Sequence, residues 1–365
     1  MRAYRYKAAR LQEVDKQFSD AEGAFDALKD YLFETNGNIE LAMDLFRQSA
    51  FVGEGEEADW RVEELFNQME AAGLIAREEA QYRLTEKGFR HLGEKTLEEF
   101  LSSLQRSRSS KHYTAAQGSG DSYTYETRTW EYGDHLDLDI SKSIQNAFTR
   151  QGVHLPIEWE RDDLEIIETE HPSRCATVLL VDISHSMVLY GIDRFTPAKK
   201  VALALSQLIR RRYQQDSLHV VLFYDRARAI PLHRLLTCEV GPFYTNTKAG
   251  LALSRRILNR SNTDNKQIIM ITDGKPSAII RHGEVVRRSW WDETIIHETL
   301  LEAETCRNAG IRINTFMLAD DPHLIEFVKK QTKLTKGKAY LTTPETLGQY
   351  LLIDYMNQRR LQIAR

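Results

Sequence analysis

An apolar run that ends in oxygen-bearing side chains constrains this chain more than any other feature of its sequence. Residues 178–181 are all Val or Leu, and they lead directly into Asp182, Ser184 and Ser186. In an extended chain alternate side chains point to the same side, so these three residues present their oxygen atoms together. Such a run is typical of a central parallel strand that is covered on both faces. Open α/β sheets bind ligands at the carboxyl ends of these strands, so the stretch predicts a ligand site there.

Two further segments supply oxygen atoms of the same kind. Residues 267–274 form a second apolar run that ends in a carboxylate. Thr245 stands just before a helical pattern, and Thr247 is expected to cap the helix that begins near residue 248. Hydroxyl and carboxylate oxygens suit Mg²⁺ or Mn²⁺ and do not suit Zn²⁺ or copper. We therefore expect one metal site formed by Asp182, Ser184, Ser186, Thr245 and Asp273.

The order and surroundings of these residues resemble a von Willebrand factor A (VWA) domain with a metal-ion-dependent adhesion site (MIDAS). The resemblance runs from Ala176 to near Tyr355, with Thr245 as the second motif and Asp273 as the third. The loop that follows the serines, residues 187–196, is longer than the family pattern. The resemblance implies that a bound Mg²⁺ takes its last ligand from a Glu or Asp of another protein.

Alternating strand and helix patterns in the carboxyl-terminal half favour an α/β fold with a doubly wound, mostly parallel, Rossmann-like sheet. We assign residues 174–365 to this VWA domain. The other expected strands are 218–224, 267–272, 311–318 and 339–341, and the expected helices are 197–212, 248–260, 292–309, 322–332 and 344–355.

Residues 1–106 resemble a winged helix. The patterns predict helices near 21–35, 39–50 and 59–72, a two-stranded wing at 74–77 and 81–85, and a helix from 86 through 101. This segment has more Asp and Glu than Lys and Arg, including Glu63, Glu64 and Glu70 on the helix that would read DNA. Because these charges repel phosphate groups, we expect a protein-docking module and no nucleic-acid partner.

Residues 107–173 are assigned to a flexible linker and an extension of the sheet edge. Residues 107–121 are polar and rich in turn-forming types. Residues 163–169 alternate between polar and apolar, so we expect them to form a strand that extends the sheet edge and precedes the first core strand in the chain.

Composition favours a soluble protein of a reducing compartment, and we expect it in the cytoplasm. The chain has 365 residues, a net charge of −4 and three cysteines without paired spacing. The apolar runs are far too short to span a membrane, and residues 1–7 lack the apolar region of a signal peptide.

The expected function is a non-enzymatic, metal-dependent adaptor. The sequence contains no phosphate-binding loop and no His-Glu-x-x-His motif. A resemblance to cytoplasmic bacterial CoxE-like proteins and to the D subunit of magnesium chelatase implies a AAA+ ATPase of the MoxR or chelatase type in trans, acting with it in remodelling of a client or metal insertion. Two alternatives stay open, namely a winged-helix DNA-binding regulator with a VWA sensor domain and a metal-dependent hydrolase.

Overall fold

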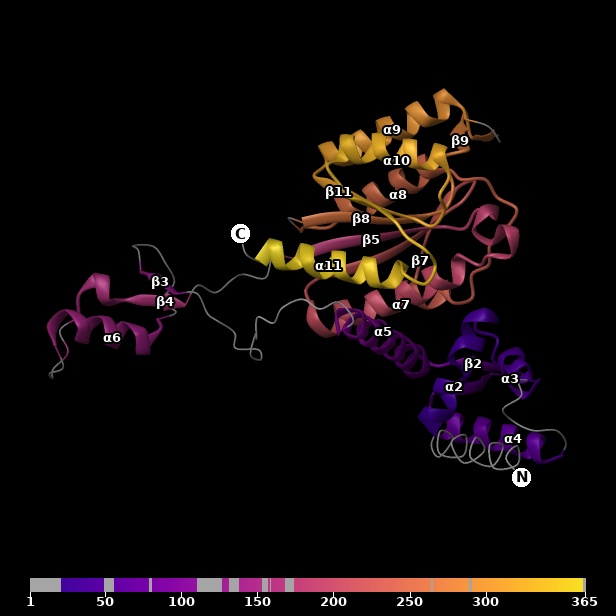
Figure 1. Cartoon of the computed structure of the whole chain (residues 1–365), viewed down its shortest axis with the longest axis horizontal. Coiled ribbons are helices and arrows are strands. Elements are labelled where there is room, and N and C mark those ends of the chain that lie inside the picture. Colours follow the sequence, from indigo (N-terminus) through magenta and orange to yellow (C-terminus); the bar gives the residue numbers. More distant parts are fainter. Residues whose placement is uncertain are drawn as a thin grey trace. The chain divides into compact units, whose positions relative to one another are not determined.

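The computed structural model describes residues 21–48, 56–78, 81–109, 127–130, 138–152, 157, 159–167, 174–263, 265–288 and 291–363. The chain divides into two compact units (Figure 1). The larger unit contains residues 1–110 and 174–359, and the smaller one contains residues 111–173 and 360–365.

A six-stranded sheet forms the centre of the larger unit. Its strand order is β12-β11-β8-β5-β6-β7, and only the edge strand β7 runs antiparallel to its neighbour. The strands are β5 (Cys175–Asp182), β6 (Ser217–Phe223), β7 (Ala227–Ile230), β8 (Asn265–Thr272), β11 (Ile311–Met317) and β12 (Ala339–Leu341). The predicted mostly parallel α/β sheet is thereby confirmed.

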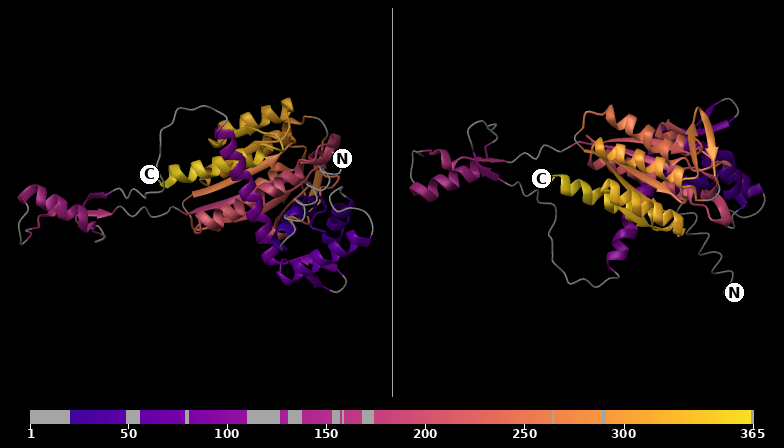
Figure 2. Two further views of the ribbon diagram at one scale, coloured as in Figure 1. Left: turned by 60° about the horizontal axis from the view of Figure 1, so that its bottom comes forward. Right: turned by 90° about the horizontal axis from the view of Figure 1, so that it is seen from above.

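Helices cover both faces of this sheet (Figures 1 and 2). One layer contains α7 (Phe195–Arg212) and α11 (Leu347–Ile363), and the other contains α8 (Thr247–Asn259), α9 (Glu293–Asn308) and α10 (Pro322–Thr335). Alternate residues of β5 enter different cores. Leu179 and Val181 pack with α7 and α11, whereas Val178 and Leu180 pack with α8 and α9. This double covering explains why β5 lacks any polar face, and none of its residues is exposed.

The amino-terminal helices and hairpin lie within a few residues of their predicted positions, except that the last helix extends well beyond its predicted end at Leu101. They are α2 (Ala21–Glu34), α3 (Ile39–Gln48), α4 (Glu56–Ala71), β1 (Ile75–Glu78), β2 (Gln81–Leu84) and α5 (Glu86–Ser109). The helix α5 passes close to the hairpin at Gly88, where a Cβ atom would lie 2.0 Å from the carbonyl oxygen of Leu74. Because α5 continues to Ser109, the linker predicted from residue 107 does not begin there, and residues 110–121 lie outside the described residues.

The amino-terminal segment packs directly on the carboxyl-terminal half of the larger unit. The helix α5 lies along α7, and Leu203 of α7 joins the amino-terminal core. Polar contacts cross the same boundary. The Lys199 ammonium donates to the Asn36 side chain at 2.5 Å, and Lys200 pairs with Asp30 at 2.6 Å. The two predicted domains therefore share one continuous compact unit.

The smaller unit corrects one expectation. Its strand β4 (Glu165–Ile167) pairs antiparallel with β3 (Thr127–Thr129) in a separate two-stranded sheet, so the prediction that residues 163–169 extend the main sheet is wrong. The helix α6 (Ile140–Gln151) packs on β4, and Arg150 holds Asp163 through two hydrogen bonds of 3.1 and 2.7 Å. β3 thus supplies the hydrogen-bonding partner that the edge of the main sheet was expected to provide.

No helix among the described residues is both long enough and apolar enough to cross a membrane.

Candidate metal centre

The five predicted ligand residues lie together at the carboxyl edge of the central sheet. The Ser184 and Ser186 hydroxyl oxygens are 3.2 Å apart. The Thr245 hydroxyl donates to the Ser184 hydroxyl oxygen at 3.0 Å, and the Ser186 hydroxyl donates to Oδ1 of Asp273 at 2.6 Å. Three segments that are far apart in the chain thus bring their oxygen atoms into one cluster.

The sheet register explains this convergence. Asp182 is the last residue of β5, and Val181 just before it pairs with Ile271 of the adjacent parallel strand β8. Asp273 follows the end of β8, so both carboxylates emerge at the same edge. After Asp182 the chain turns, and the Ser184 backbone N–H donates to Oδ1 of Asp182 at 2.8 Å.

Thr245 enters the cluster from the turn before α8. Asn246 caps that helix, because its side-chain oxygen accepts the backbone N–H of Ala249 at 3.0 Å. The expectation that Thr247 is the cap is wrong, since Thr247 is already the first helical residue. The cap at Asn246 leaves the preceding threonine outside the helix, with its hydroxyl directed at Ser184.

Both carboxylates of the cluster are buried. Asp182 is 0% exposed and Asp273 is 5% exposed. Burial, and next the charge of Asp273, raise the pKa of Asp182, although the Thr272 hydroxyl opposes the shift by donating to its Oδ2 at 2.6 Å. Burial also raises the pKa of Asp273. Two acids so placed among neutral hydroxyls lack enough compensating positive charge, which a divalent cation would supply.

The chemistry of the donor set fits Mg²⁺ or Mn²⁺, because every candidate ligand atom is an oxygen. No group of three or more His, Cys, Asp or Glu residues suited to a metal occurs among the described residues. A metal at this edge would therefore depend on the serine and threonine hydroxyls as well as on the two carboxylates.

Arg194 contacts the cluster and was not anticipated from the sequence. Its Nη1 lies 3.4 Å from Oδ2 of Asp273 and donates to the Ser186 carbonyl oxygen at 3.1 Å. Its Nε donates to the Leu318 carbonyl oxygen at 3.0 Å. The long loop after the serines folds back on itself, with the Arg194 N–H donating to the Met187 carbonyl oxygen at 2.9 Å. No residue spacing in the sequence predicts that this loop brings Arg194 back to the cluster.

Two small residues after β8 also shape the cluster. The Ser277 hydroxyl accepts the Thr245 N–H at 3.0 Å, and the Ser277 N–H donates back to the Thr245 carbonyl oxygen at 2.9 Å. At Gly274 a Cβ atom would lie 3.2 Å from the Thr245 hydroxyl oxygen and 3.3 Å from that of Ser186. Glycine therefore leaves the space that these two oxygens occupy.

An ion pair between the buried Asp225 and the exposed Arg287 anchors the Thr245 turn to the hairpin β9 (Ala278–Arg281) and β10 (Glu284–Arg287). Asp225 accepts the backbone N–H of Tyr244 at 3.1 Å and two bonds from Arg287, at 3.1 and 2.7 Å. Burial is the largest single effect and raises the pKa of Asp225, but the hydrogen bonds from Arg287 and the Tyr244 N–H, together with the charges of Arg287 and Arg226, outweigh it and lower that pKa. The hairpin thus helps to hold the turn that carries Thr245.

A doubly wound sheet of this order, with an oxygen-rich cluster at its carboxyl edge, is characteristic of the VWA class. Residues 175–356 match the family model described as "Rv0959-like protein, vWA domain", and the carboxyl-terminal half of the chain is a VWA domain. Residues 123–169, which include most of the described part of the smaller unit, match the model described as "Rv0959-like protein, third domain".

The curated relatives are longer than this chain. "Uncharacterized protein Rv0959" of Mycobacterium tuberculosis (strain ATCC 25618 / H37Rv) is 30% identical over 292 residues, which cover 77% of this chain and 43% of the relative. "Uncharacterized protein Mb0984" of Mycobacterium bovis gives the same values. The chain therefore spans less than half the length of the relatives that it matches.

Solved structures resemble this chain only remotely. A D319A mutant of the PilB minor pilin from Streptococcus sanguinis is 16% identical with a TM-score of 0.45, over 55% of this chain and 66% of that one. The vWF domain of the pilus tip protein Mfa5 from Porphyromonas gingivalis is 14% identical with a TM-score of 0.40, over 51% and 96%.

Proposed function

We propose that the VWA domain is a metal-dependent protein-binding site and that the chain works as a non-enzymatic adaptor. The observation that carries the proposal is the cluster of two buried carboxylates and three hydroxyls at the carboxyl edge of the sheet. When bound there, Mg²⁺ or Mn²⁺ would offer a coordination position to a Glu or Asp side chain of a partner protein.

The residues around the cluster support this role because they fix the oxygen atoms in place. The Thr272 hydroxyl and the Ser184 N–H hold the two oxygens of Asp182. Ser277 holds the backbone of Thr245 from both sides. When the ligand atoms of a site are already held in place, less conformational entropy is lost as the metal ion binds.

An adaptor suits these contacts better than a hydrolase does. The hydroxyls of Ser184, Ser186 and Thr245 lie within hydrogen-bond distance of one another or of Asp273, which is close enough for them to share one bound cation. A nucleophile would need a base such as histidine held against it. The hydrolase and the DNA-binding regulator gain no support from the described residues.

By analogy with the resembled families, we further propose that the partner is a AAA+ ATPase of the MoxR or chelatase type, acting in trans in the cytoplasm. The chain would link ATP-driven remodelling to a client protein without itself entering a membrane or binding nucleic acid. This part rests on family resemblance.

The test combines metal binding with partner capture. Full-length protein is first titrated with Mn²⁺ and Mg²⁺ by calorimetry, as wild type and as Asp182→Ala. The same proteins are then used for capture from the native extract in Mg²⁺, with and without a chelator, followed by mass spectrometry. Asp320→Ala is the matched control, because Asp320 is an exposed carboxylate just beyond β11 at the same edge of the sheet.

A AAA+ ATPase retained by wild type and Asp320→Ala, and lost with Asp182→Ala and with the chelator, supports the adaptor. Recovery of the same proteins from every sample would exclude a metal-bridged partner. Absence of Mn²⁺ and Mg²⁺ binding by the wild type would remove the metal site itself.

A further inference from the structure

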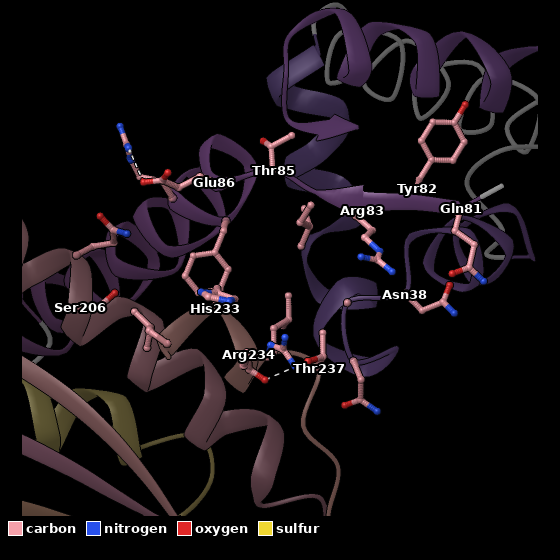
Figure 3. Close-up of a pocket in the computed structure, with 18 of the residues that line it drawn as sticks. Asn38, Gln81, Tyr82, Arg83, Thr85, Glu86, Ser206, His233, Arg234 and Thr237 are labelled. Atoms are coloured by element: carbon pink, nitrogen blue, oxygen red, sulfur yellow. Dashed lines mark hydrogen bonds and ion pairs between the residues drawn. The ribbon is translucent and has the colours of Figure 1, made fainter. Parts of the chain in front are cut away.

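A cleft of about 1080 Å³ opens between the amino-terminal hairpin and the VWA domain (Figure 3). Its amino-terminal wall contains β2, the start of α5 and the turn before α3. Its opposite wall contains α7 and η3 (Leu232–Leu235). Both walls belong to the larger compact unit. The cleft lies outside the metal centre, because none of the five cluster residues lines it.

Positive charge gathers on both walls. Arg83 and Arg90 line the amino-terminal wall, and Arg210 and Arg234 line the opposite one together with His233. Figure 3 shows Arg83 extending from the hairpin toward the space that His233 and Arg234 face from the other side. Among the described residues, neither Arg210 nor Arg234 has an acidic side chain within ion-pair distance. The guanidinium groups of Arg210 and Arg234 are therefore available to an anionic ligand, whereas Arg83 lies 2.8 Å from the exposed Glu78 carboxylate.

The two acidic residues of the cleft are already engaged. The Glu40 carboxylate accepts the backbone N–H of Tyr82 at 2.5 Å. The Glu86 carboxylate lies 3.5 Å from Arg90. Because four arginines and only these two glutamates line it, the cleft has a net positive charge in a chain whose overall charge is −4. A cavity with one sign of charge concentrates ligands of the opposite sign.

Gln207 adds an unpartnered acceptor to the lining. The residue is 5% exposed, and its side-chain oxygen has no hydrogen-bond partner among the described residues. A buried amide oxygen without a donor costs free energy that a ligand N–H would recover. A peptide carries such donors along its backbone.

The strand β2 favours an extended polypeptide as the occupant. Among the described residues it pairs with β1 on one side only, and all four of its residues line the cleft. The Tyr82 N–H is already bound by Glu40, so a peptide would use the remaining main-chain groups of this strand. Extended peptides add to sheet edges of this kind through main-chain hydrogen bonds. The volume of the cleft also equals or exceeds that of the largest typical small-ligand pockets, which is roughly 1,000 Å³.

We propose that this cleft binds an extended acidic segment of a partner protein, which lies along β2 with Asp or Glu side chains facing the arginines. The proposal does not depend on the metal centre, so a variant without metal ligands is expected to bind the same segment.

The probe is a fluorescent ten-residue peptide of alternating Glu and Thr, measured by anisotropy against the full chain at low salt. Wild type is expected to bind it, and Arg83→Glu combined with Arg234→Glu is expected to weaken binding about tenfold. The matched control is Arg256→Glu combined with Arg260→Glu, two exposed arginines at the end of α8. It and Asp182→Ala are expected to bind as wild type does.

If the double variant fails to fold, Arg210→Glu takes its place, because Arg210 is exposed on α7. A version of the peptide with alternate backbone nitrogens methylated tests the strand edge and is expected to bind more weakly. An equal loss in the control variant would overturn the proposal. So would a single-stranded ten-nucleotide probe that binds while the acidic peptide does not.

Discussion

The guanidinium of Arg194 lies 3.4 Å from the carboxylate of Asp273, so one of the two buried acids of the cluster already has a cation beside it. Asp182 is held differently, by the Thr272 hydroxyl and the Ser184 N–H. The two acids are therefore not equivalent. We infer that Asp182 contributes the larger uncompensated charge to a bound cation and that Arg194 reduces the contribution of Asp273.

Removal of the Arg194 charge is expected to strengthen metal binding. In Arg194→Gln the repulsion between the guanidinium and the cation disappears, and Mn²⁺ affinity should rise by roughly threefold to tenfold. Arg194→Lys keeps a positive charge in the loop and should stay close to wild type. Calorimetric titration with Mn²⁺ measures both. Weaker binding by the Gln variant would show instead that Arg194 acts mainly by holding the loop through Ser186 and Leu318.

Asp182→Asn is expected to lower Mn²⁺ affinity by about a hundredfold or more, because it removes a ligand charge and not merely a supporting contact. The amide side chain has nearly the same size as the carboxylate, and its oxygen can still accept the Ser184 N–H. The fold should therefore be kept. Mn²⁺ titration and thermal unfolding without metal check the two statements separately. Unchanged Mn²⁺ affinity in a folded variant would contradict the assignment of Asp182 as a ligand.

Gly274→Ala is expected to weaken Mn²⁺ binding severalfold while the protein stays folded. The new methyl group would press on the hydroxyl oxygens of Thr245 and Ser186 at 3.2 and 3.3 Å. Overpacking of this kind costs about 1 kcal/mol or somewhat more in stability. Urea unfolding and Mn²⁺ titration measure the two effects. A loss of stability with full metal affinity would mean that those oxygens are not ligands.

Lys199 makes the stability of the larger unit depend on pH. It is fully buried, and its ammonium donates to Asn36 and to the Leu236 carbonyl oxygen. Burial lowers its pKa to about 8. The unfolded chain keeps this proton up to about pH 10.5. Between these values the unfolded state holds more protons, so stability rises with pH, by about 3 kcal/mol at most.

Lys199→Met removes this titration and replaces the buried charge with an apolar side chain. The free energy of unfolding of wild type, relative to Lys199→Met, should therefore increase between pH 7 and pH 10. Urea unfolding of both proteins at several pH values measures this difference. Parallel pH profiles for the two proteins would show that the burial of Lys199 carries no such cost.

Local patterns were sufficient to predict most of the fold. The apolar run of β5 has no polar face because helices cover both sides of the sheet, and that feature is visible in residues 178–181 alone. The alternation of strands and helices then follows from periodicity. The amino-terminal hairpin was equally recognisable, since β1 and β2 are separated by only two residues.

Partner choice was the weak point of the sequence interpretation. The polar and apolar alternation near residue 166 correctly indicates a strand, but it says nothing about which strand it joins. β4 pairs with β3, some forty residues earlier, and not with the main sheet. The position of the helix cap at Asn246 was likewise a choice between neighbouring polar residues that only the backbone geometry resolves.

The sequence by itself determined which residues form the strands of the VWA sheet, except the edge strand β7, and which five side chains meet at its carboxyl edge. These features depend on periodicity and on the short distance between each strand end and its polar residue. Tertiary structure alone decided the contact of Arg194 with Asp273, the burial of Lys199 and the arginine-lined cleft. Each of these joins segments whose approach depends on how whole helices and loops pack, and no local pattern encodes that packing.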